Sequence, residues 1–67
     1  MKIRSIVTNR IYEQEDMVYI TNVRQIAKYL KHRATLYDLI EEGDRVVAAF
    51  SRKETQKLYE KWQAHEL

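Results

Sequence analysis

The sequence predicts a small α+β domain: a short N-terminal strand or arm, a helix, an antiparallel β-hairpin and a C-terminal helix. Three observations support this fold class. Apolar residues recur at helical spacing after Asn22, the one glycine separates two strand-like runs, and a capping sequence at Ser51 opens a last amphipathic stretch. We expect one domain over residues 1–67, with an N-terminal strand or arm (1–16) and a β-α-β-β-α core (17–67).

The first part of the chain favours extended structure without deciding its form. β-Branched and aromatic residues precede the acidic stretch Glu13–Asp16, namely Ile3, Ile6, Val7, Ile11 and Tyr12. The same residues also have a spacing that suits a helix, so strand, helix and arm all stay open for residues 1–16. Val18, Tyr19 and Ile20 predict a short second strand.

The first helix is expected to begin at Thr21 or Asn22, whose side chains can accept a hydrogen bond from a free amide of the first turn. Its apolar residues fall on one stripe and are expected to face the core: Val23, Ile26, Ala27 and Leu30. Basic residues at 31–33 suit the carbonyl end of this helix, where cations are favoured.

Two strands are expected at Thr35–Ile40 and Arg45–Phe50. Gly43 lies between them and takes a positive φ angle at no steric cost, so we place the turn there. Alternation gives the second strand one face with Val46, Ala48 and Phe50 and another with Val47 and Ala49.

The last helix opens with Ser51-Arg52-Lys53-Glu54, which has the pattern of a capping box. Leu58 and Trp62 follow at helical spacing and are expected to close the core over the sheet. The complete predicted core consists of Val23, Ile26, Ala27, Leu30, Leu36, Ile40, Val46, Ala48, Phe50, Leu58 and Trp62.

Composition excludes several classes of protein. With 45% hydrophobic and 33% charged residues, the chain is too apolar for disorder and too charged for a membrane protein. No apolar run approaches the ~20 residues of a membrane span, and the N-terminus lacks the pattern of an export signal. The absence of cysteine excludes disulfides and thiolate metal sites. We expect a cytoplasmic protein with no membrane partner.

No arrangement of residues predicts catalysis or a cofactor. His32 and His65 are the only histidines, and neither has a carboxylate or hydroxyl at a spacing that suggests a shared site. A metal centre needs several converging ligands, and a phosphate-binding loop needs more than one glycine. We therefore expect no catalytic residues, no cofactor and no metal. The favoured interpretation is a non-enzymatic module that binds a protein partner or itself.

An apolar surface on the hairpin predicts self-association. Two helices can cover one face of the sheet, which leaves a candidate interface on the other: Tyr37, Leu39, Val47 and Ala49. An uncovered patch of this kind marks an interface, and two-fold pairing is the commonest closed arrangement. The sequence thus predicts a homodimer, unless the N-terminal arm covers the patch within one chain.

A nucleic-acid partner is the less favoured alternative. Residues 22–40 can be threaded onto a helix-turn-helix whose second helix covers Ala34–Ile40, with Arg45–Phe50 as a wing. The candidate nucleic-acid contacts in that case are Arg24, Lys28, Lys31 and Arg33. The secondary structure of Thr35–Ile40 distinguishes the two interpretations, because the hairpin requires a strand there and the helix-turn-helix requires a helix.

Four segments carry a further similarity: Val18–Leu30, Leu36–Ile40, Arg45–Ser51 and Leu58–Trp62. Through them the chain resembles a family of short proteins of Gram-positive bacteria, their phages and mobile elements, grouped as a domain of unknown function. The resemblance implies a strand, a helix opened by Thr-Asn, a hairpin ending in phenylalanine and a short helix, and a phage or mobile-element origin. Arg33 stands where the family has glycine, and Ala49 where it has a bulkier residue. The resemblance implies no activity and no functional residues.

Overall fold

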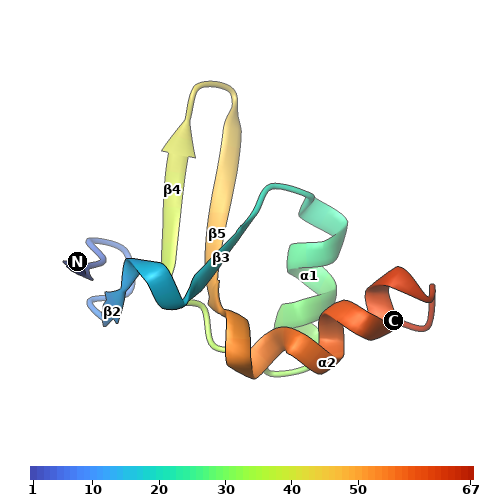
Figure 1. Ribbon diagram of the computed structural model, residues 1–67. Helices are drawn as coiled ribbons and strands as arrows, with labels where there is room; N and C mark the ends of the chain where they lie inside the picture. Colours follow the sequence, from blue (N-terminus) through green and yellow to red (C-terminus); the bar gives the residue numbers. More distant parts are fainter.

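The computed structural model describes residues 1–67 and has the predicted α+β class (Figure 1). Its elements are β1 (Lys2–Arg4), β2 (Ile11–Glu13), the 3₁₀ turn η1 (Gln14–Asp16), β3 (Met17–Ile20), α1 (Val23–Lys31), β4 (Asp38–Glu42), β5 (Arg45–Ser51) and α2 (Arg52–Gln63). From Met17 onward the order is therefore β-α-β-β-α. The N-terminal residues form a two-stranded hairpin, β1–β2, rather than a single strand or arm.

The main sheet has three antiparallel strands in the order β3-β5-β4, so β3 and β4 are edge strands (Figure 1). Ala48 and Phe50 of β5 pack toward α1 and α2, and we name this side of the sheet the helical face. Ala49 packs toward the N-terminal hairpin, and we name this side the N-terminal face. The sheet thus forms the middle of three layers.

The larger core cluster lies on the helical face. Tyr29 of α1 is 1% exposed, and its ring meets that of Phe50 edge to face with a centroid distance of 5.3 Å. Aromatic pairs of this geometry contribute about 0.5–1.5 kcal/mol beyond the area that they bury. Around this pair lie Ile20, Ala48 and the half-buried residues Val18, Ile26, Ala34, Leu36, Leu58 and Trp62.

The prediction of which α1 side chains are buried is wrong in part. The predicted core residues Val23, Ala27 and Leu30 are exposed. α1 directs Ile26 and Tyr29 at the sheet instead, because the large Tyr29 ring removes more apolar surface from water than the smaller side chains of the expected stripe. The helix exists where the sequence places it, but its buried face is rotated.

The first strand of the hairpin also differs from expectation. It begins at Asp38 rather than Thr35, because the Glu54 carboxylate of α2 holds Thr35 through its N–H at 2.8 Å and its hydroxyl at 3.2 Å. In the resulting register Ile40 pairs with Val47 and lies on the N-terminal face, not in the predicted core. Val46, another predicted core residue, lies beyond the last β3–β5 pair and is 43% exposed.

The turn and the helix starts agree with the sequence. Gly43 has a φ of 63°, as its place in the turn requires. Asn22 caps α1, because its side-chain oxygen accepts the N–H groups of Arg24 at 3.0 Å and Gln25 at 3.2 Å. These short-range signals therefore fix the boundaries of both the hairpin turn and the first helix.

α1 ends in a left-handed residue. Arg33 has a φ of 66°, and two hydrogen bonds close the end of the helix, from Ala34 N–H to the Tyr29 carbonyl at 3.1 Å and from Arg33 N–H to the Leu30 carbonyl at 3.0 Å. This is the Schellman arrangement, in which glycine is the commonest residue at the left-handed position. The glycine that the resembled family has there suits this backbone.

Ser51 is the N-cap of α2, and its hydroxyl accepts the N–H of Glu54 at 3.2 Å. The second half of the predicted capping box is absent, because the Glu54 carboxylate binds Thr35 instead.

We expect Ser51→Ala to lower the free energy of unfolding by about 1 kcal/mol, the usual value for a lost N-cap. Urea unfolding followed by circular dichroism measures this change. An unchanged midpoint would contradict the assigned cap, and Ser51→Asn, which retains a capping oxygen, is the matched control.

Candidate functional site

The four residues of the predicted self-association surface do not form one exposed patch. Val47 and Ala49 are 7% and 0% exposed, and Tyr37 is half-buried. Leu39 is exposed, but it pairs with Ala48 and so lies on the helical face. The N-terminal hairpin covers the patch within the chain, as the sequence allowed, so the surface on which the homodimer prediction rested is not available.

Asp38 fixes the N-terminal hairpin to the sheet. It is 8% exposed and accepts hydrogen bonds from the Ser5 hydroxyl at 2.6 Å, the Tyr12 hydroxyl at 2.6 Å and the Leu39 N–H at 2.8 Å. Burial by itself would raise the pKa of the Asp38 carboxyl, but these three bonds favour the charged form and hold that pKa below its ordinary value. Burial, and then the bond to Asp38, raise the pKa of the Tyr12 hydroxyl.

The helix-turn-helix alternative is wrong, because residues 34–37 are not helical and β4 occupies Asp38–Glu42. The candidate nucleic-acid contacts are only partly brought together. Arg24 and Lys28 line a hollow of about 270 Å³ with Trp62, His65 and Leu67, while Lys31 and Arg33 lie outside it. A nucleic-acid partner itself stays a prediction that the fold does not test.

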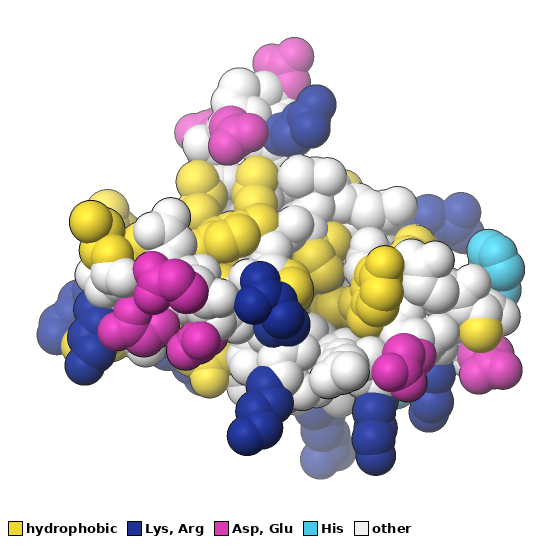
Figure 2. Space-filling model, in the orientation of Figure 1, with side chains coloured by type: hydrophobic (Ala, Val, Ile, Leu, Met, Phe, Trp, Pro, Cys, Tyr) yellow, Lys and Arg dark blue, Asp and Glu magenta, His cyan; other side chains and the backbone are white.

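The helical layer is nevertheless basic. α1 and α2 carry seven lysines and arginines against two glutamates. Figure 2 shows Lys and Arg side chains projecting along the α2 side of the molecule, with acidic side chains at the hairpin tip, near the N-terminal part and, in smaller number, beside the C-terminal end of α2. No ion pair joins any of these helical cations to an acidic side chain. The molecule is therefore dipolar rather than uniformly basic.

Two further features bear on the class of protein. No group of three or more His, Cys, Asp or Glu side chains is placed to hold a metal ion. None of the helices combines the length and the apolar character needed to cross a membrane. The expected absence of catalysis and of a cofactor stays a prediction.

The free edge of β3 is the strongest candidate for a binding surface. β3 pairs with β5 on one side only. Its four residues are Met17-Val18-Tyr19-Ile20, with no lysine, proline or acidic residue. Charged residues and proline are the usual protection of an edge strand against pairing with another chain. The residues of β3 themselves supply none of this protection.

The backbone of β3 presents hydrogen-bonding groups at the free edge. Arg52 donates from Nη2 to the Met17 carbonyl at 3.1 Å, which places that carbonyl on the side away from β5. Backbone groups of successive strand residues point alternately to the two sides, so Tyr19 directs its N–H and C=O to the same free edge. No side chain or loop hydrogen bond reaches either group of Tyr19.

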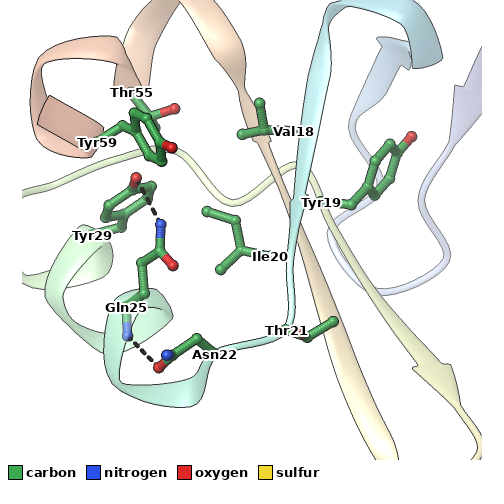
Figure 3. A pocket seen from close by; sticks show the side chains of 9 residues that line it. All are labelled: Val18, Tyr19, Ile20, Thr21, Asn22, Gln25, Tyr29, Thr55 and Tyr59. Atoms are coloured by element: carbon green, nitrogen blue, oxygen red, sulfur yellow. Dashed lines mark hydrogen bonds between the residues drawn. The ribbon is translucent and has the colours of Figure 1, made fainter. Parts of the chain in front are cut away.

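A hollow of about 320 Å³ opens at this edge on the helical face (Figure 3). Val18 and Ile20 supply apolar surface from β3. The other lining residues are Tyr19 of the same strand, Thr21 and Asn22 before α1, Gln25 and Tyr29 of α1, and Thr55 and Tyr59 of α2. Gln25 donates from Nε2 to the Tyr29 hydroxyl at 3.0 Å. We name this the helical-face hollow; it has aliphatic surface, an amide and phenol groups, and no charge.

A second hollow, of about 380 Å³, lies on the N-terminal face and crosses the sheet from β3 over β5 to β4, the opposite edge strand; we name it the N-terminal-face hollow. Tyr19 and Thr21 line both hollows. The other residues around the N-terminal-face hollow are Gln14, Ile40, Glu42 and Val47. In the view of Figure 2, hydrophobic side chains reach the surface in the middle of the molecule, between the tip of the β4–β5 hairpin and α2.

No family model, curated protein or solved structure matches the chain. The resemblance to a phage-associated family and the origin that it implies therefore stay expectations of the sequence.

Proposed function

We propose that the protein is a non-enzymatic peptide-binding module that adds an extended segment of a protein partner to its sheet at the free edge of β3. One observation carries this proposal: a largely apolar, uncharged hollow opens beside an edge strand whose own residues include no charge and no proline. In recognition by strand addition, main-chain hydrogen bonds supply affinity, and pockets for alternate side chains supply specificity.

The main-chain part of the interaction is centred on Tyr19. The N–H and C=O of Tyr19 point away from β5 and have no hydrogen-bond partner within the chain. A strand added at this edge would form hydrogen bonds with both groups. The strand would lie next to β3 in the plane of the sheet, where Arg52 occupies only the Met17 carbonyl. Pairing would therefore extend from Tyr19 toward Thr21.

The helical-face hollow would receive a side chain of the bound segment. Successive residues of a strand point to opposite faces, so every second residue of the bound segment would face α1 and α2. The aliphatic surface of Val18 and Ile20 favours a large apolar side chain at this position. Full burial of such a side chain contributes about 1.5–3 kcal/mol.

The proposal is tested by selecting a phage-displayed library of random nine-residue peptides against the immobilised protein. We expect enrichment of sequences that alternate a large apolar residue with other residues. Tyr19→Pro should abolish the enrichment, because proline removes the N–H at the free edge and adds bulk there. Proline is tolerated on edge strands whose N–H faces solvent, so the variant is expected to fold.

Tyr19→Ala is the matched control, since it loses the same ring but retains the N–H group. It should still enrich peptides that Tyr19→Pro does not, and circular dichroism establishes that both variants are folded. Equal binding by the two folded variants would exclude strand addition. If Tyr19→Pro fails to fold, protection of the Tyr19 amide from hydrogen exchange by an enriched peptide decides instead, and an unprotected amide would overturn the proposal.

A further inference from the structure

We infer that the helical layer carries a second binding site, which takes one base of a single-stranded nucleic acid in a hollow and the neighbouring phosphates along α1. The hollow has a volume of about 270 Å³ and is lined by Arg24, Lys28, Trp62, His65 and Leu67; we name it the basic hollow. It shares no lining residue with the helical-face hollow at β3, so the inference goes beyond the proposed function.

The end of α2 turns back to form this hollow. His65 has a left-handed φ of 59° and donates its N–H to the Trp62 carbonyl at 3.1 Å, while Glu66 donates its N–H to the Lys61 carbonyl at 2.8 Å. These are the two hydrogen bonds of a Schellman motif. Leu67 then packs against the core cluster of the helical face, which fixes the end of the chain beside α1.

The cations of the basic hollow are free to bind an anion. Neither Arg24 nor Lys28 makes an ion pair, whether with an acidic side chain or with the terminal carboxylate of Leu67. No aspartate or glutamate lines the hollow, and Glu66 lies outside the lining although it is next to two of its residues in sequence. An anionic group that enters the hollow would therefore meet two unpaired positive charges.

The row of cations continues beyond the hollow along α1. Arg24, Lys28 and Lys31 are spaced four and three residues apart, so they lie on one face of the helix over a length of about 10 Å. α1 contains no acidic residue. A row of this length suits a polymer with repeated negative charges better than a single anion, and the phosphate backbone of a nucleic acid is such a polymer.

Trp62 gives the hollow an aromatic surface. Its side chain is half-buried; it packs against the core cluster and also lines the hollow. Aromatic side chains on which bases stack, beside a positively charged groove, are the general construction of sites for single-stranded nucleic acid. The carboxylate of an acidic peptide offers no flat ring to Trp62, so this residue favours nucleic acid over an acidic protein segment.

The test follows the fluorescence of Trp62, the only tryptophan of the chain, during titration with an oligothymidylate of about 12 nucleotides. We expect quenching, because a base in the hollow contacts the indole ring. An abasic oligomer with the same number of phosphates should bind more weakly and leave the fluorescence nearly unchanged. A plot of the logarithm of the association constant against that of the salt concentration should have a slope of about −2, since three cations meet phosphates of a single strand.

Two double variants locate the site. Arg24→Ala with Lys28→Ala should lower the affinity for the oligothymidylate about tenfold and reduce the slope to about −0.7, because one phosphate contact remains. Lys2→Ala with Arg4→Ala is the matched control: it removes the same two kinds of charge from β1, in the layer on the other side of the sheet, and should change the affinity less than about twofold. Circular dichroism establishes that both double variants are folded.

Four outcomes would overturn the inference. They are the absence of binding, equal losses of affinity in the two double variants, equal binding and quenching by the abasic oligomer, and displacement of the oligothymidylate by polyglutamate of equal total charge at an equal concentration. The second would show a general attraction by net charge, and the last would assign the basic hollow to an acidic protein segment. Strand addition at β3 is tested separately, because none of the substituted residues lines the helical-face hollow.

Discussion

Replacing Asp38 by alanine is expected to lower the free energy of unfolding by about 2–4 kcal/mol. The substitution leaves the hydroxyls of Ser5 and Tyr12 without their acceptor in a buried place, where each unsatisfied polar group costs about 1–3 kcal/mol. A loss of this size is a large part of the stability of a small domain. The N-terminal hairpin should separate from the sheet first, because Asp38 is its buried polar attachment.

Urea unfolding followed by circular dichroism measures this loss, and Asp44→Ala is the matched control. Asp44 is an exposed turn residue whose side chain makes no hydrogen bond, so its loss should change stability by no more than about 0.5 kcal/mol. Asp38→Asn should fall between the two, since it keeps the shape and one acceptor oxygen. Equal effects of Asp38→Ala and Asp44→Ala would show that the buried carboxylate does not hold the hairpin.

The same carboxylate predicts the response to acid. Because the pKa of Asp38 is lower in the folded than in the unfolded chain, its contribution is fully present above about pH 4 and is lost as the pH falls through the folded value. Asp38→Asn should therefore lose less stability than the wild type on acidification. The pKa of Tyr12 is raised, so its contribution is present below about pH 10 and is lost at higher pH.

The elements that short-range chemistry specifies could be predicted from the sequence. Asn22 and Ser51 cap the two helices, and Gly43 turns the hairpin, because each acts on backbone groups within a few residues of itself. The order of elements from Met17 onward follows from these signals. The N-terminal residues carry no comparable signal, and their pairing as β1–β2 was open.

The buried faces depended on contacts between distant residues and were less predictable. The apolar stripe of α1 allowed more than one rotation, and the meeting of Tyr29 with Phe50 selects one that exposes Val23. The register of β4 depends on where Glu54 holds Thr35, a contact between separate elements. The periodicity of a single segment predicts neither the rotation of α1 nor the register of β4.

The candidate site was not predicted, because it depends on strand order. β3 is an edge only because β5 lies between β3 and β4, and its hollows combine residues from three or more elements. The sequence did contain one relevant signal, an uncharged run of strand-forming residues at Val18–Thr21. Whether such a run lies at the edge or in the centre of a sheet cannot be learned from the run itself.

Deleting Met1–Arg10 is expected to leave a chain that unfolds or aggregates at micromolar concentration. The deletion removes β1 and three attachments to the sheet region: Ser5 to Asp38 at 2.6 Å, Thr8 to the Tyr37 carbonyl at 2.7 Å and Arg10 to the Leu36 carbonyl at 3.2 Å. It also removes Ile3, which packs against the cluster of Tyr12, Met17 and Ala49, and leaves β2 without its partner strand, so the cover of the N-terminal face is loosened. An exposed apolar sheet face of this kind promotes association.

The double variant Ile6→Ser, Val7→Ser is the matched control within the same segment. These side chains are 100% and 60% exposed, so their replacement should leave the fold intact and change stability by about 0.5 kcal/mol or less. Light scattering and circular dichroism of the full chain, the double variant and the truncated chain separate the two effects. If the truncated chain aggregates and the double variant stays folded, the buried contacts of residues 1–10 with the sheet are what the fold requires. A folded, monodisperse truncated chain would show that β3, β4 and β5 do not need this cover.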